Sequence, residues 1–118
     1  QLNNINFIEL DSFRGLSKLE CLSLQANMIK IIKNEYFVDL VSLKILDLKL
    51  NQIEFIEASS FFKLENLTMI NIENNKLLKI EQNLLRQQSK LKEFSLTNNF
   101  IANLDFYYPE SSFIEKIK

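Results

Sequence analysis

The 118-residue sequence contains no histidine, and this absence limits the chemistry that it can support. Histidine is the commonest general base and the commonest metal ligand in proteins. A single cysteine, Cys21, leaves no pair of thiolates for a zinc site. A single glycine leaves no glycine-rich loop for a phosphate. The sequence therefore predicts a protein that is not an enzyme and that uses no cofactor or metal.

Charge and hydropathy exclude two further classes of function. The net charge is -1 and the pI about 5.5, whereas nucleic-acid-binding domains carry a basic patch. No run of 18 apolar residues occurs, so no segment is suited to span a bilayer. Glycine and proline occur once each, which leaves no linker composition. We therefore expect one domain, with no nucleic-acid partner and no membrane insertion in this stretch.

The sequence does contain a repeat with a constant step of 24 residues. Its clearest markers are five asparagines: Asn3, Asn27, Asn51, Asn75 and Asn99. With Leu19 as position 1 of a unit, apolar residues recur at positions 1, 4, 6, 11, 14, 19 and 22. A fixed period of this length indicates a stacked array, in which each unit buries its apolar face against its neighbours.

Each unit begins with the pattern LxxLxL, which alternates at its end as a short strand does. The alternation points Leu22 and Leu24 inward and Ser23 outward. We expect parallel strands centred near Ser23, Asp47, Asn71 and Ser95. The asparagine that follows each strand can satisfy turn backbone groups and bridge to the next unit. The phenylalanines at position 19 are expected to stack as an internal spine: Phe13, Phe37 and Phe61.

These residues resemble the leucine-rich repeat family, and more narrowly its 24-residue "typical" subclass. The resemblance covers Leu2 to Leu104 and implies an α/β fold. This fold is a right-handed solenoid with a parallel concave β-sheet and a mostly irregular convex side. About five units occupy residues 1–104, and residues 105–118, where the period is lost, form an irregular repeat or a cap. Because the chain enters the repeat midway through a unit, we expect it to be a piece of a longer array.

The resemblance implies a function in recognition. The subclass is similar to Toll-type receptor ectodomains and secreted insect immune proteins, which favours an extracellular or cell-surface module that binds a protein ligand or co-receptor. A dimer is a further expectation. Two alternatives stay open. The first is a cytoplasmic scaffold or adaptor, favoured by the lack of cysteine-stapled caps and by the single thiol. The second is a structural role, in which the array spaces or dimerises other domains.

The candidate partner-binding residues lie between the inward-facing leucines of two central strands: Ile45, Asp47, Lys49, Met69, Asn71 and Glu73. They combine unlike charges with apolar points on a rigid frame, which lowers the ordering cost of binding. The convex side is richer in lysine and glutamate, which interfaces exclude from their centres. We also expect Lys49 and Glu73 to form an exposed cross-strand ion pair.

Two single residues complete the candidate sites. Asn66 opens the sequon Asn66-Leu67-Thr68 and is the predicted glycosylation site. Cys21 occupies position 3 and is expected to be a half-buried small hydrophobe, with a thiol that pairs with a partner as the alternative.

Overall fold

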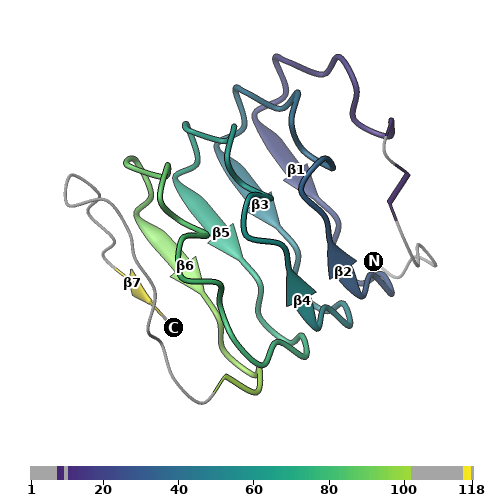
Figure 1. Ribbon diagram of the computed structural model, residues 1–118, viewed down its shortest axis with the longest axis vertical. Helices are drawn as coiled ribbons and strands as arrows, with labels where there is room; N and C mark the ends of the chain where they lie inside the picture. Colours follow the sequence, from purple (N-terminus) through teal and green to yellow (C-terminus); the bar gives the residue numbers. More distant parts are fainter. Residues whose placement is uncertain (1–7, 10, 102–115, 118) are drawn as a thin grey trace.

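The computed structural model describes residues 8–9, 11–101 and 116–117, and its main feature is a parallel five-stranded sheet (Figure 1). The strands follow the order β1-β3-β5-β6-β7. Their bounds are Cys21–Ser23 for β1, Ile45–Asp47 for β3, Met69–Asn71 for β5, Glu93–Ser95 for β6 and Lys116–Ile117 for β7. The first four strands are centred one residue earlier than expected. The prediction of one parallel strand in each 24-residue unit is confirmed for these four.

The register of the sheet reproduces the repeat. Leu22 pairs with Leu46, Leu46 with Ile70, and Ile70 with Phe94, each at a step of 24 residues. The last step is one residue shorter, because Phe94 pairs with Ile117. The tail that was expected to be an irregular repeat or a cap therefore supplies the fifth strand. Residues 105–115 of that tail lie outside the described residues.

The core lies behind the sheet and is continuous from unit to unit. Leu43, Leu46 and Leu48 are fully buried, as are their counterparts in the next unit. Leu22, on the first strand, is only half-buried and packs against the cluster from its end. Full burial of a large aliphatic side chain stabilises the folded state by roughly 1.5–3 kcal/mol relative to leaving the side chain exposed. Stacked units thus provide the burial that a single strand and turn lack.

The phenylalanine spine is confirmed. The ring centroids of Phe13 and Phe37 lie 5.9 Å apart, and those of Phe37 and Phe61 lie 6.5 Å apart in a stacked arrangement. Phe37 and Phe61 are fully buried, whereas Phe13 is partly exposed. Aromatic pairs at these separations add about 0.5–1.5 kcal/mol beyond the area that they bury.

The asparagine column also forms the expected ladder. Asn51 Nδ2 donates to Leu48 O at 3.0 Å within its own unit and to Leu24 O at 2.9 Å in the unit before. Its Oδ1 accepts from the amide of Ile29 at 3.1 Å. Asn75 repeats the same set of bonds one unit later. One buried amide therefore satisfies backbone groups of two units, which fixes the spacing between them.

A left-handed residue precedes each ladder asparagine, and the sequence pattern had not indicated it. Ala26, Leu50, Asn74 and Asn98 have φ between 59° and 62°. This conformation ends the strand and turns the chain toward the ladder. Asparagine tolerates it, whereas a branched side chain such as that of Leu50 is strained there.

The side of the array opposite the main sheet contains turns and no helix in the residues that the structure describes, so the α/β class is wrong for this part of the chain. Single turns close there through i→i+3 bonds, such as Tyr36 N to Lys33 O at 3.2 Å and Leu40 N to Phe37 O at 3.0 Å. Two short strands, β2 (Ile31–Ile32) and β4 (Phe55–Ile56), form a separate parallel pair (Figure 1).

Candidate functional site

The outer face of the main sheet places four of the six predicted partner-binding residues on two adjacent strands, β3 and β5, and the other two just beyond the strand ends. Ile45 is the register partner of Met69, and Asp47 is the register partner of Asn71. Lys49 and Glu73 follow two residues after these polar side chains. All six are half-buried. The four residues on β3 and β5 are flanked by β1 on one side and by β6 on the other.

Two of these residues also have a structural task that the sequence reading missed. Asp47 Oδ1 accepts a hydrogen bond from the amide of Lys49 at 3.1 Å. Asn71 Oδ1 accepts from the amide of Glu73 at 2.9 Å. These are local Asx-type turns, which hold the side chain against its own backbone. The centre of the face is consequently fixed in conformation before any partner arrives.

The predicted ion pair between Lys49 and Glu73 is wrong. The ion pairs among the described residues are Arg14 with Asp11, Lys44 with Glu20 and Lys79 with Glu81. An exposed pair gains little Coulomb energy and costs the rotamer entropy of two long side chains. Lys49 and Glu73 therefore remain unpaired charges on the same surface, each able to contact a partner.

Cys21 is exposed with a free thiol, so the expectation of a half-buried residue is wrong. Ile45 and Met69 occupy the same position in the next two units and lie between strands on both sides. Cys21 lies on β1, the first strand of the described sheet, which has β3 on one side only. The missing flank explains the greater exposure.

Asn66 lies at the surface, half-buried, in the turn before β5. Its Nδ2 donates to Val41 O at 2.9 Å, and its Oδ1 accepts from Lys90 Nζ at 2.7 Å. A glycan attaches at Nδ2, the same atom that donates to Val41 O, and leaves one N–H on that atom. Glycosylation of this sequon stays a prediction.

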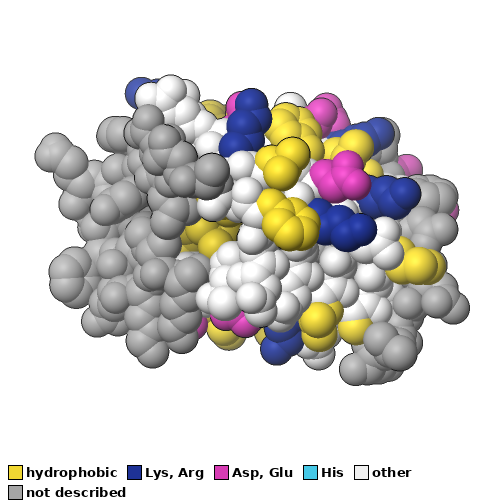
Figure 2. Space-filling view, turned by 90° about the horizontal axis from the view of Figure 1, so that it is seen from below, with side chains coloured by type: hydrophobic (Ala, Val, Ile, Leu, Met, Phe, Trp, Pro, Cys, Tyr) yellow, Lys and Arg dark blue, Asp and Glu magenta, His cyan; other side chains and the backbone are white. Residues whose placement is uncertain are grey.

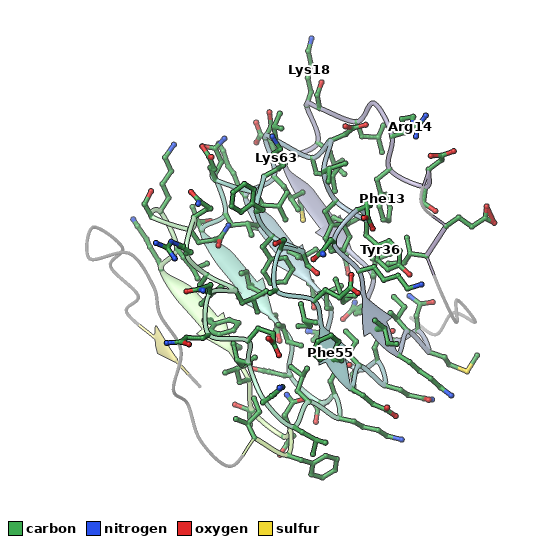
Figure 3. All side chains as sticks on the ribbon, viewed as in Figure 1. Phe13, Arg14, Lys18, Tyr36, Phe55 and Lys63 are labelled. Carbon is green, nitrogen blue, oxygen red and sulfur yellow. The ribbon has the colours of Figure 1, made fainter. Side chains whose placement is uncertain are left out.

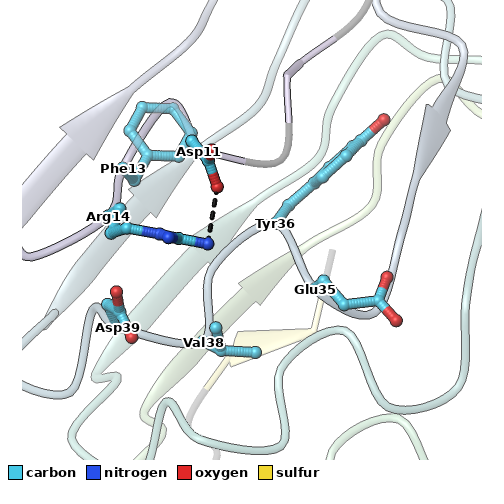
Figure 4. A pocket seen from close by; sticks show the side chains of 7 residues that line it. All are labelled: Asp11, Phe13, Arg14, Glu35, Tyr36, Val38 and Asp39. Carbon is cyan, nitrogen blue, oxygen red and sulfur yellow. Dashed lines mark ion pairs between the residues drawn. The ribbon is translucent and has the colours of Figure 1, made fainter.

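A hollow of about 440 Å³ lies between two successive turns, residues 11–15 and 35–39 (Figure 4). Phe13 and Tyr36 form its aromatic wall. Arg14 Nη2 contacts Asp11 Oδ1 at 2.7 Å, and Asp39 Oδ2 accepts from the amide of Gly15 at 3.0 Å. Two of the three carboxylates that line it therefore already have partners within the fold. None of its charged residues was singled out from the sequence.

The remaining chemistry of the described residues is limited. Within residues 8–9, 11–101 and 116–117, no cluster of three or more histidine, cysteine, aspartate or glutamate side chains is arranged to hold a metal ion. The same part of the chain has no helix of the length and apolarity needed to cross a membrane.

A second surface was missed by sequence reasoning. Among the residues that the structure describes, the most exposed large hydrophobic side chains are Leu78, at 67% exposure, and Phe100, at 64%. Ile31 and Phe55 are also exposed and are register partners in the β2–β4 pair. We call these four residues the edge patch. Seen from below, hydrophobic side chains gather on this side of the molecule among lysines and acidic residues (Figure 2). A signal was present in the sequence, because Leu78 replaces the charged Lys30 and Glu54 of the preceding units.

The comparison with protein families agrees with this geometry. The family model described as "Leucine rich repeat" matches residues 1–53, 19–77 and 42–101. No curated protein in the comparison matches the chain. Leucine-rich repeat domains generally mediate recognition between proteins, and they are typically not enzymes. The matched residues span most of the chain, and their strands, ladder and core repeat at the same step, so the chain belongs to the leucine-rich repeat family.

Proposed function

We propose that the chain is a non-enzymatic recognition module that binds a protein partner through the outer face of its five-stranded sheet. The observation that carries this proposal is the placement of four candidate residues in register on β3 and β5, with Lys49 and Glu73 two residues beyond the strand ends and all six side chains half-buried. An exposed sheet face of this kind is too open for a small molecule, which prefers an enclosed pocket. It suits part of a protein interface.

The composition of the face supports the same proposal. Ile45 and Met69 lie side by side and supply apolar area at its centre. The unpaired charges of Lys49 and Glu73 lie at one end of the same strands. Interfaces commonly combine an apolar centre with a polar rim. Because the Asx turns already hold Asp47 and Asn71 in place, little conformational entropy is lost when a partner binds.

For the compartment, we place the chain in an extracellular receptor or a secreted immune protein, with a right-handed array of the 24-residue subclass. The resemblance of the repeat and the surface position of the Asn66 sequon support this placement. The alternative is an intracellular scaffold or adaptor. The exposed free thiol of Cys21 favours that alternative, because such thiols persist in reducing compartments.

The binding proposal is tested by charge reversal at Lys49 and Glu73, singly and together. A partner is first isolated on the immobilised wild-type chain, and its Kd is then measured for each variant. Reversal of a contacting charge should weaken binding by about tenfold or more. The control is Lys63→Glu, which reverses an exposed charge on the turn between β4 and β5 (Figure 3).

The double variant also separates contact from net charge. Lys49→Glu with Glu73→Lys keeps the net charge of the protein, so its loss of binding reports the arrangement of charges on the face. If Lys63→Glu weakens binding and the changes at Lys49 and Glu73 do not, the partner binds elsewhere and the proposal is wrong.

A further inference from the structure

Leu50, the residue after Lys49, combines two features that each disfavour the folded state. Its φ is 60°, in the left-handed region where a large side chain is crowded by its own backbone. Its side chain is 50% exposed and lies outside the buried core. Among the residues that the structure describes, Leu50 is the one large apolar residue with a positive φ. It is therefore strained without the gain from burial that other leucines of the repeat contribute.

The repeat shows that the fold does not require leucine at this position. Ala26, Asn74 and Asn98 occupy the same position in their units, with φ between 59° and 62°. Their units keep the same strand register as the unit of Leu50. The edge patch differs in this respect, because its exposed residues have no positive φ. Exposure of a single apolar side chain needs no explanation, but strain that the fold does not require points to a function.

The backbone places Leu50 beside the two unpaired charges of the outer face. Lys49 precedes it in the chain, and the amide of Leu50 donates to Glu73 O at 3.0 Å. In the next unit, the equivalent Asn74 already accepts a hydrogen bond from Asn98 Nδ2 at 2.9 Å. At this end of β3 and β5, the face thus offers one exposed leucine next to a lysine and a glutamate.

We propose that Leu50 is a contact residue for the protein partner of the outer face, and that the contacting segment of the partner presents an apolar side chain to Leu50, a carboxylate to Lys49 and a cation to Glu73. This inference rests on the proposed function, because it names the chemistry of the partner that the face binds. Contact would remove the exposed half of the leucine from water. The opposite charges would fix the orientation of the segment.

The strain at Leu50 favours binding in a second way. The left-handed conformation is already present in the free chain, and the bond from its amide to Glu73 O holds the backbone there. Its cost therefore falls on folding and not on association. A side chain that is held in place before contact loses little entropy when a partner covers it.

The mixed charges beside Leu50 favour a protein over other large partners. Nucleic acids and anionic lipid surfaces present negative charge alone, which Glu73 would repel. A protein segment can supply an apolar group, an anion and a cation within a few residues. The chemistry at this end of the face therefore matches a protein segment best.

The test uses a library of random peptides displayed on phage and selected on the immobilised 118-residue chain. Enriched peptides are expected to carry a large apolar residue close to an acidic and a basic one. Leu50→Asn should weaken their binding by roughly three- to tenfold, which corresponds to burial of half a leucine side chain. The same substitution should raise the melting temperature, because asparagine tolerates the left-handed conformation. Leu50→Met, which keeps an apolar side chain, should retain binding.

Phe62→Asn is the matched control, because Phe62 is 52% exposed and lies on the turn between β4 and β5. It should leave the Kd of the enriched peptides unchanged. The proposal is overturned if no peptide is enriched, or if Leu50→Asn binds the peptides as tightly as the wild-type chain. A variant Leu50→Asn that loses both binding and thermal stability also overturns it, since leucine would then be required by the fold.

Charge reversal at Lys49 and Glu73 separates this inference from the proposed function. Peptides that respond to the charge reversals but not to Leu50→Asn bind the outer face without contact to Leu50, so the inference alone fails. Peptides that respond to none of these changes bind elsewhere, and the proposed function fails as well.

Discussion

Substitution of Asn51 by alanine should lower the free energy of unfolding by about 3 kcal/mol. The amide of Ile29, a fully buried residue, has the Asn51 side chain as its partner. Loss of that acceptor leaves a buried N–H unpaired, which costs about 1–3 kcal/mol. The bonds from Asn51 to Leu24 O and Leu48 O are also lost. Leu24 O keeps a second donor in Asn27, and Leu48 O keeps one in Asn75. Loss of the two bonds from Asn51 therefore adds only about 1 kcal/mol in total.

The measurement is urea unfolding, followed both by circular dichroism and by tyrosine fluorescence, because repeat arrays can depart from two-state behaviour. Asn83→Ala is the matched control. Asn83 is exposed and its side chain makes no hydrogen bond in the described structure, so a change below about 0.5 kcal/mol is expected. Asn51→Asp keeps the shape but sets a carboxylate against two carbonyl oxygens, and it should be at least as destabilising at neutral pH. If Asn51→Ala and Asn83→Ala unfold alike, the ladder does not hold the units together.

Three further outcomes are expected. Phe37→Ala removes the central ring of the buried spine and should lower the free energy of unfolding by about 3–5 kcal/mol, as measured in urea. Lys49→Ala should lower it by less than about 0.5 kcal/mol. Equal effects would refute the assignment of Phe37 to the interior and Lys49 to the surface. Leu50→Asn should stabilise the chain by about 1 kcal/mol, because asparagine accepts the φ of 60° that strains leucine, and an unchanged or lower melting temperature would contradict this reason. Expression in a eukaryotic secretory system should give a glycan on Asn66, seen as a mass shift on glycosidase treatment that disappears in Asn66→Gln. No shift would favour the intracellular alternative.

The period was enough to predict the strands, the ladder and the spine. Each depends on a side chain that recurs at one position and is buried because its neighbours are buried, so the pattern of leucine, asparagine and phenylalanine carries the information. The same logic fails where a residue departs from the pattern. Gln88 replaces leucine at position 22, and although it is polar it is fully buried. Its Nε2 donates to Phe61 O at 2.7 Å and to Leu64 O at 3.1 Å, whereas its Oε1 has no partner.

The candidate site was predictable only in part. The outward direction of Ile45 and Met69 follows from strand alternation, and their adjacency follows from the 24-residue step. The backbone bonds of Asp47 and Asn71 depend on the turn geometry after each strand, which the apolar pattern does not encode. The absent ion pair of Lys49 reflects a balance of solvation and entropy, which sequence spacing cannot fix. Leu78 and Phe100 were missed because they occupy positions that are polar in most units.

The constant register has a consequence for how such a chain changes its length. Leu22, Leu46, Ile70 and Phe94 each pair with a residue one unit away, and the ladder bonds reach no further. Removal or duplication of a whole unit would therefore create a junction of the same kind as those already present. The array can lengthen by duplication of a coding segment, and each added strand widens the outer face without any rearrangement of the older units. The extent of the outer face thus changes in whole units, whereas the side chains that it presents change by single residues between the leucines.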